Sequence, residues 1–133
     1  MLLLKRSIKP RASRPPSVEM NKEIILVNME EEIRPFLVAF LEKRGFSVIK
    51  AKAKELPRLI RDKKPAFVLL ESADTTQAKE TIEKTAKIKE KPKIILMSRV
   101  RISPKEFLLL REAGIDTILD YPVLAQNLIQ SLE

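Results

Sequence analysis

Short apolar runs alternate with segments of helical periodicity from residue 23 to the end of the chain. Five such runs occur, most of them continuous and rich in Ile, Val and Leu: 24–27, 48–49, 67–70, 94–97 and 115–119. Continuous runs of this length are typical of strands buried on both faces of a parallel sheet. The pattern therefore predicts five strands.

Helical spacing appears in each segment that follows an apolar run. After the first run, apolar residues recur at i, i+3, i+4, i+7 and i+8 and predict an inward stripe of Ile33, Phe36, Leu37, Phe40 and Leu41. Further helices are expected in four places: over about 54–62, after Asp74, after Ser103 and over 123–132. The pattern therefore predicts one helix after each strand.

Both glycines of the chain support these boundaries. Gly45 and Gly114 each stand just past an expected helix end, where a residue in the left-handed conformation is common. Five strands that alternate with five helices imply a parallel sheet with right-handed crossovers. We expect an α/β, flavodoxin-like (βα)5 doubly wound sheet of strand order 2-1-3-4-5 for residues 22–133.

Residues 1–21 differ from the rest because they have no periodicity. They contain three prolines, three serines and five basic residues, Lys5, Arg6, Lys9, Arg11 and Arg14. Together with Lys22 and Glu19 this gives a net charge of +5, whereas the remaining 111 residues carry 20 basic and 17 acidic side chains. We expect a flexible basic arm suited to nucleic acid or another polyanion; the alternative is a disordered or mis-assigned start.

Missing residue types exclude several kinds of chemistry. The chain has no Cys and no His, which excludes disulfides, tight zinc sites and Ser-His or Cys-His nucleophiles. There is no Gly-rich phosphate loop, and no stretch approaches the ~20 apolar residues of a membrane span. A cytoplasmic protein without cofactor, metal or catalytic residue is expected.

Four segments resemble those of one family in their order and spacing: 26–34, 65–71, 95–98 and 113–122. Residues 23–133 resemble a CheY-like response-regulator receiver domain over essentially their whole length. The resemblance implies a site at which an Asp accepts a phosphoryl group beside a divalent cation. That cation is held by an acidic pair, and a Ser or Thr hydroxyl and a Lys complete the five functional positions.

Most of these positions are altered. Asn28 and Met29 stand where the resemblance places the acidic pair, and a thioether is a poor ligand for a hard cation. Glu30 is the only nearby carboxylate that could restore a metal site. Glu71 stands in place of the acceptor Asp and is one methylene longer. It would imitate a phosphorylated Asp or be a solvated carboxylate at a strand end.

The remaining positions of the site also differ from those that the resemblance implies. Tyr121 replaces the Lys, and Arg99 occupies a place that is usually small. Arg99 could instead form an ion pair with Glu71. Of the five positions only Ser98 keeps its type, so phosphorylation is expected to be abolished. The resemblance also implies a cis peptide bond before Pro122.

The family's usual partner surface is formed by the fourth helix, the fifth strand and the fifth helix. Its apolar residues here are Phe107, Leu108, Leu109, Leu124 and Leu128. They form either a surface for docking a partner or for homodimerisation, or part of a large hydrophobic core.

The leading interpretation is a non-enzymatic pseudo-receiver in two-component signal transduction or a phosphorelay, which regulates through protein–protein interaction. It is expected to stand alone, with no effector domain after residue 133. The alternative is a basic accessory protein that binds a polyanion through its arm. A working phosphoacceptor would need Glu30 and Glu71 to behave unusually.

Overall fold

The computed structural model describes residues 22–28, 34–121 and 123–133. These residues form one parallel sheet of five strands: β1 (Glu23–Val27), β2 (Ser47–Ala51), β3 (Phe67–Ser72), β4 (Lys93–Ser98) and β5 (Thr117–Asp120). The strand order is β2-β1-β3-β4-β5. The predicted fold class and strand order are therefore confirmed.

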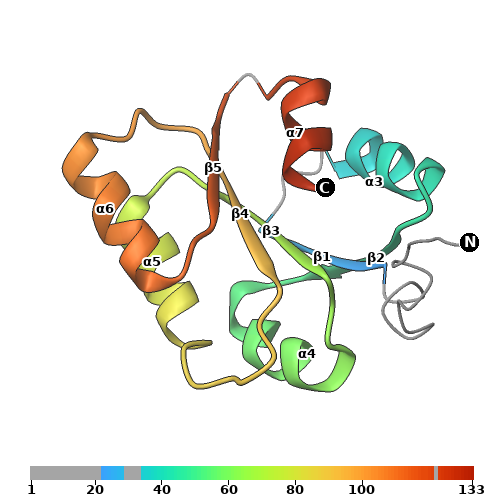
Figure 1. The fold of residues 1–133 in the computed structure, drawn as a ribbon, viewed down its shortest axis with the longest axis horizontal. Coiled ribbons are helices and arrows are strands. Elements are labelled where there is room, and N and C mark those ends of the chain that lie inside the picture. The colour runs from blue at the N-terminus through green and yellow to red at the C-terminus, as the bar shows by residue number, and fades with distance from the viewer. Residues whose placement is uncertain (1–21, 29–33, 122) are drawn as a thin grey trace, which may run out of the picture.

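Within the described residues, four α-helices and one 3-10 turn connect the strands, and a fifth α-helix follows the last strand. They are α3 (Arg34–Lys43), η1 (Ala53–Glu55), α4 (Leu56–Lys63), α5 (Thr75–Glu83), α6 (Pro104–Ala113) and α7 (Ala125–Ser131). As Figure 1 shows, α3 and α7 lie on one side of the sheet and α4, α5 and α6 on the other. The molecule thus has three layers.

Alternation along the strands builds a separate core on each face of the sheet, since successive side chains of a strand point to opposite faces. Ile24, Leu26 and Leu69 pack with Leu37 and Leu41 of α3. Their neighbours in sequence form the second core, which α4, α5 and α6 cover: it includes Ile25, Val27, Val68, Leu70, Ile60, Ile82 and Leu110. Continuous apolar runs are required because both faces are covered.

Helix ends follow the local signals in the sequence. The Ser103 hydroxyl accepts a hydrogen bond from the Glu106 N–H, and the Glu106 carboxylate accepts one from the Ser103 N–H, which forms a capping box. Gly45 and Gly114 have φ values of +92° and +121°. Both predicted C-terminal glycines are thus confirmed in conformations that other residues rarely adopt.

Three details differ from the sequence prediction. The last strand begins at Thr117 rather than 115, because the Ile115 N–H closes the end of α6 by donating to the Leu110 carbonyl at 3.1 Å. The last helix, α7, is shorter than 123–132 at both ends.

Phe36, which was predicted to face inward, is 80% exposed. Successive helical residues are about 100° apart, so Phe36 lies about 120° from the centre of the buried stripe that Leu37 and Leu41 form, on the solvent side of the helix. Ile33, the first residue of that predicted stripe, lies outside the described residues.

Candidate functional site

The predicted site lies where the carboxyl ends of β1, β3, β4 and β5 meet. A pocket of about 650 Å³ opens at this edge, and Asn28, Glu71 and Arg99 line it. Ser98 and Tyr121 lie beside it, at the end of β4 and just after β5. Met29 and Glu30 lie outside the described residues, and so does Pro122, so the predictions about them stay as they were.

Glu71 is a buried carboxylate, with only 3% of its surface exposed. Strand alternation places it on the same face as Leu69, and Met97 lies opposite it in the register of β3 and β4. Tyr121 packs against that same core. The Tyr121 hydroxyl donates a hydrogen bond to Oε2 of Glu71. The alternative of a solvated carboxylate at this position is therefore wrong.

Tyr121 is held in its neutral, donating form. Burial raises the pKa of its hydroxyl above the ordinary value, and the hydrogen bond to Glu71 and the negative charge of Glu71 act in the same direction. Arg99 lowers this pKa, and its guanidinium carbon lies 5.7 Å from the centroid of the Tyr121 ring. Three of the predicted residues, Glu71, Arg99 and Tyr121, thus form one connected group. In it the neutral Tyr121 hydroxyl takes the position at which the resemblance implies a Lys.

Ser98 is buried and uses its hydroxyl locally. The hydroxyl donates to the Val100 carbonyl at 2.6 Å and accepts from the Val100 N–H at 3.3 Å. A serine hydroxyl carries a single proton to donate. The one functional position whose residue type is kept therefore has its proton engaged by the backbone of its own loop.

Asn28 follows β1 directly and has the left-handed conformation, with φ +56°. Asn tolerates this region better than most residues. Its N–H donates to the Ala51 carbonyl at 3.3 Å, which continues the pairing between β1 and β2. Its side chain is exposed and lines the pocket.

The described residues of the site do not suit the divalent cation that the fold family implies, and Glu30, the nearby carboxylate that could restore a metal site, lies outside them. Such hard cations require several oxygen ligands. Here Asn28 offers a neutral amide oxygen, Met29 carries a thioether, and the Glu71 carboxylate already accepts a hydrogen bond from the Tyr121 hydroxyl. Within residues 22–28, 34–121 and 123–133, no three His, Cys, Asp or Glu side chains come close enough together to hold a metal ion.

Two basic residues that the sequence analysis missed also line the pocket. Lys54 belongs to η1, and Lys84 is the C-cap of α5. With Arg99 they make three basic residues in a lining whose acidic residues are Glu71 and Glu80. No sequence motif joins positions 54, 84 and 99; only the fold brings them to one pocket. The site is thus more basic than the acidic site of the family.

One residue of the predicted partner face is misplaced. Leu128 is only 4% exposed and packs in the core with Leu37 and Met97. It is buried because α7 covers the same face of the sheet as α3. Phe107, Leu108 and Leu109 of α6 are exposed, and so is Leu124, the N-cap of α7. The exposed part of the predicted face therefore consists mainly of α6.

The basic arm, with Lys5, Arg6, Lys9, Arg11 and Arg14, lies outside the described residues, and its predicted role stays a prediction. In the parts of the chain that are described, no helix combines the length and apolar character needed to cross a bilayer.

Comparison with known proteins identifies the fold. Neither a protein-family model nor a curated protein matches the sequence. Among solved structures, the chain is similar to a CheY-like response regulator receiver domain protein from Methanospirillum hungatei JF-1, with a TM-score of 0.71 and 24% identity over 84% of this chain and 90% of that one. A response regulator receiver protein from Pseudomonas putida has the same TM-score at 18% identity and covers 84% and 95% of the two chains.

A third similar structure is a response regulator from Burkholderia pseudomallei that contains a phosphorylated aspartic acid, a calcium ion and citrate. Its TM-score is 0.65 at 18% identity, over 84% of this chain and 66% of that one. The structural neighbours are thus CheY-like receiver domains. Identities of 24% and 18% establish a shared fold, and the chemistry has to be argued from this chain's own residues.

Proposed function

We propose that this protein is a cytoplasmic, non-catalytic pseudo-receiver that acts in signal transduction by binding a protein partner and is not phosphorylated at the acceptor position. The observation that carries the proposal is the hydrogen bond from the Tyr121 hydroxyl to the buried Glu71 carboxylate. Glu71 and Tyr121 stand at the positions of the acceptor Asp and of the Lys of a receiver, and here they are hydrogen-bonded to each other.

Phosphoryl transfer depends on positioning and on stabilisation of negative charge. The Glu71 carboxylate is committed to Tyr121 and has little exposed surface from which to attack a donor. The Ser98 hydroxyl is committed to Val100. Each of these interactions favours a site fixed in one state rather than a switch.

The same arrangement bears on whether Glu71 imitates a phosphorylated Asp. Such a mimic would keep the Ser98 hydroxyl directed at the acceptor position, yet this hydroxyl donates to the Val100 carbonyl. We therefore favour a structural role for Glu71, which ties the end of β3 to the residue that follows β5.

Binding to a partner is the function left to such a domain, and α6 offers the surface for it. Leu108 is 63% exposed, flanked by the exposed side chains of Phe107 and Leu109. Three consecutive exposed apolar residues on one helix are an unusual feature for a surface that contacts only water. We propose that this part of α6 docks a protein partner or a second copy of the chain.

The phosphorylation part is tested with magnesium and a small phosphoryl donor, or with the beryllofluoride analogue. We expect no mass increase and no amide shifts at Glu71, Ser98 or Tyr121. The comparison variant carries the family's residues through Asn28→Asp, Met29→Asp, Glu71→Asp, Arg99→Ala and Tyr121→Lys. A phosphoryl adduct on Glu71 of the unmodified chain would contradict the proposal.

The docking part is tested with Leu108→Glu combined with Leu109→Glu. We expect this variant to remain folded and to lose self-association or partner capture. Gln126→Glu with Gln130→Glu is the matched control, because it adds the same charge at two exposed positions of α7. Equal assembly of both variants and the parent protein in sedimentation and capture experiments would exclude the α6 surface.

A further inference from the structure

Basic residues concentrate in two segments that contain no predicted site residue. Residues 58–64 and 84–93 together carry nine basic and two acidic side chains, a net charge of +7. The rest of residues 23–133 carries 11 basic and 15 acidic side chains, a net charge of −4. The small positive charge of the folded domain therefore conceals a strong local asymmetry.

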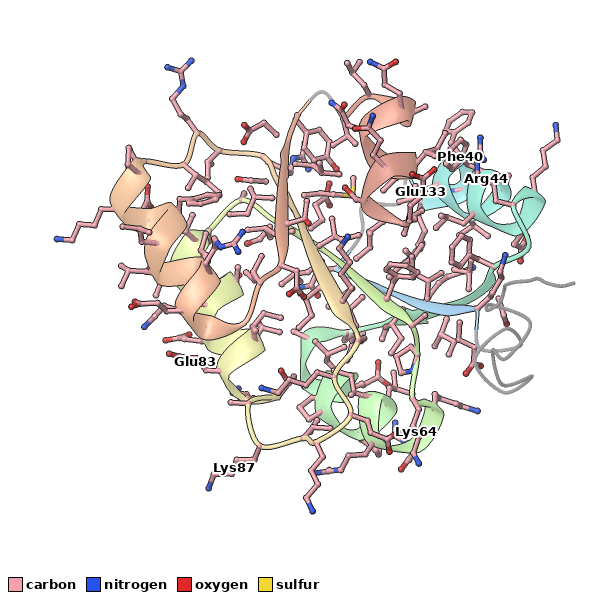
Figure 2. All side chains as sticks on the ribbon, in the orientation of Figure 1. Phe40, Arg44, Lys64, Glu83, Lys87 and Glu133 are labelled. Carbon is pink, nitrogen blue, oxygen red and sulfur yellow. The ribbon has the colours of Figure 1, made fainter. Side chains whose placement is uncertain are left out.

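The fold brings the two segments together at the amino edge of the sheet. The first ends α4 and leads into β3, and the second follows α5 and leads into β4. A groove of about 500 Å³ lies between them; its charged lining residues are basic except for Glu83, and the basic ones are Arg61 from α4 and Lys84, Lys87 and Lys89. Lys64 also contacts Glu90 across the two segments at 3.2 Å. In Figure 2, Lys64 and Lys87 lie at the same end of the molecule.

These basic side chains are directed to solvent. Arg58, Arg61, Lys63 and Lys64 are exposed, and so are Lys84, Lys87, Lys89 and Lys91. Cations at the end of α4 suit the helix dipole. Lys87, Lys89 and Lys91 lie beyond the end of α5, so the helix dipole does not account for them. We call the two segments together the basic surface.

We propose that the basic surface binds the phosphate backbone of double-stranded DNA without sequence preference. Lysine-rich surfaces that contact phosphates provide affinity but no base readout. The large exposed hydrophobic side chains of the described chain all lie elsewhere: Phe36, Val100, Phe107, Leu108, Leu109 and Leu124.

That distribution decides between partners. A protein interface usually has apolar or aromatic anchors at its centre, and a single-strand binder uses aromatic side chains on which bases stack. Insertion into a membrane also needs exposed apolar residues. The basic surface has charge without these anchors, which suits a regular array of phosphates.

The arm enters the domain at the same edge. Lys22, the first described residue, precedes β1, and its carbonyl accepts a hydrogen bond from the Ser47 N–H at the start of β2 at 2.9 Å. The described chain therefore begins at the edge that carries the basic surface. This inference does not rest on the pseudo-receiver proposal, because it uses the opposite edge of the sheet and shares only Lys84 with the lining of the candidate-site pocket.

The experiment measures anisotropy of a labelled, random-sequence DNA duplex with the full-length protein at several salt concentrations. The test variant combines Lys87→Gln, Lys89→Gln and Lys91→Gln. We expect its affinity to fall about tenfold or more and the salt dependence, the slope of log K against log salt, to weaken by about 2 to 3, since each phosphate contact contributes about 0.9. The matched control, Lys43→Gln with Lys50→Gln and Lys105→Gln, removes the same charge at exposed positions elsewhere and should change affinity less than about twofold.

Further arms of the experiment make the proposal falsifiable. A full-length variant in which Lys5, Arg6, Lys9, Arg11 and Arg14 become Gln measures the contribution of the arm. The proposal is overturned if the parent protein does not bind the duplex, if the control weakens binding as much as the test variant, or if the test variant binds normally while the arm variant does not. Stronger competition by polyglutamate, single-stranded DNA or anionic vesicles than by unlabelled duplex would also overturn it.

Discussion

The two edges of the sheet treat their polar groups in opposite ways. At the carboxyl edge, the Glu71 carboxylate is buried and accepts a hydrogen bond from the Tyr121 hydroxyl, and the Ser98 hydroxyl donates to the Val100 carbonyl. At the amino edge, the basic surface leaves like charges close together and exposed to solvent. Polar groups at the carboxyl edge are thus hydrogen-bonded within the protein, whereas those at the amino edge give a local excess of positive charge.

This difference separates what holds the fold together from what can recognise a partner. Buried polar groups that pair with each other stabilise one conformation, because breaking the pair leaves an unsatisfied group. Exposed charges contribute little to stability and are available to a ligand of opposite charge. Our proposal therefore gives the carboxyl edge a structural role, whereas the amino edge carries the larger net charge.

The largest expected effect concerns the pair at the carboxyl edge. Tyr121→Phe should lower the free energy of unfolding by about 1.5–3 kcal/mol, because it removes a hydrogen bond to a buried carboxylate. Urea unfolding measures the change. The double variant Tyr121→Phe with Glu71→Leu should lose less than the sum of the two single variants, since neither polar group is then left without the other.

The amino edge supplies the control for this prediction. Lys64→Gln removes an ion pair with Glu90 whose side chains are 60% and 72% exposed. The expected loss is at most about 1 kcal/mol. If Lys64→Gln costs as much as Tyr121→Phe, the contrast between the two edges is wrong.

The titration of Tyr121 tests the same contrast spectroscopically. Tyr121 is the only tyrosine and the chain has no tryptophan, so phenolate absorbance reports this residue alone. Its raised pKa means that the folded protein keeps the proton at a pH where the unfolded chain, with a pKa of about 10, has lost it. The absorbance transition of the folded protein should therefore lie above that of the chain in urea.

Linkage fixes the sign of the effect on stability. The contribution of Tyr121 is fully present below pH of about 10 and is lost as pH rises toward the folded-state pKa. The stability difference between the parent protein and Tyr121→Phe should therefore shrink above about pH 10. A difference that grows with pH over this range would show that Tyr121 donates no hydrogen bond to Glu71.

The fold could be predicted from the sequence because its signals are local and agree with one another. Continuous apolar runs marked the strands, and Ser103, Gly45 and Gly114 marked helix ends whose caps the structure contains. The strand order followed from the alternation of strands and helices and from the family resemblance.

The site could be predicted only as a list of positions. Asn28, Glu71, Ser98, Arg99 and Tyr121 were named, and an ion pair between Glu71 and Arg99 was considered and stays a prediction. The hydrogen bond from Tyr121 to Glu71 was not foreseen. That contact depends on which face of β3 the side chain occupies and on how the chain turns after β5. Leu128 and Phe36 were misplaced for a related reason, since helical periodicity gives a stripe without fixing its centre.

A smaller effect is expected at the start of α6, where the carboxyl edge is also internally bonded. The Glu106 carboxylate accepts from the Ser103 N–H and from the Thr75 hydroxyl at 2.8 Å, which joins α6 to α5. Ser103→Ala should cost about 1 kcal/mol through loss of the N-cap. Chemical denaturation measures this cost, and Ser47→Ala, an exposed serine in β2, is the control.

The pH dependence of this cap has the opposite sign to that of Tyr121. The hydrogen bond from the Ser103 backbone, followed by those from the Thr75 and Ser103 side chains, lowers the pKa of Glu106 below its ordinary value. Its contribution is therefore present above the unfolded-state pKa and is lost as pH falls. A Glu106→Gln variant should approach the stability of the parent protein at acidic pH, and a constant difference would contradict the assignment.

The smallest effect on stability is expected at the amino edge. Neutralising Lys87, Lys89 and Lys91 together should change the free energy of unfolding by no more than about 0.5 kcal/mol, because all three side chains are exposed. At low ionic strength the change should be a slight gain, since removing like charges relieves repulsion, and salt should abolish it because it screens exposed charges. Urea unfolding at low and high salt measures both. A substantial loss that salt does not alter would mean that these lysines are structural, and the two edges would then differ in degree rather than in kind.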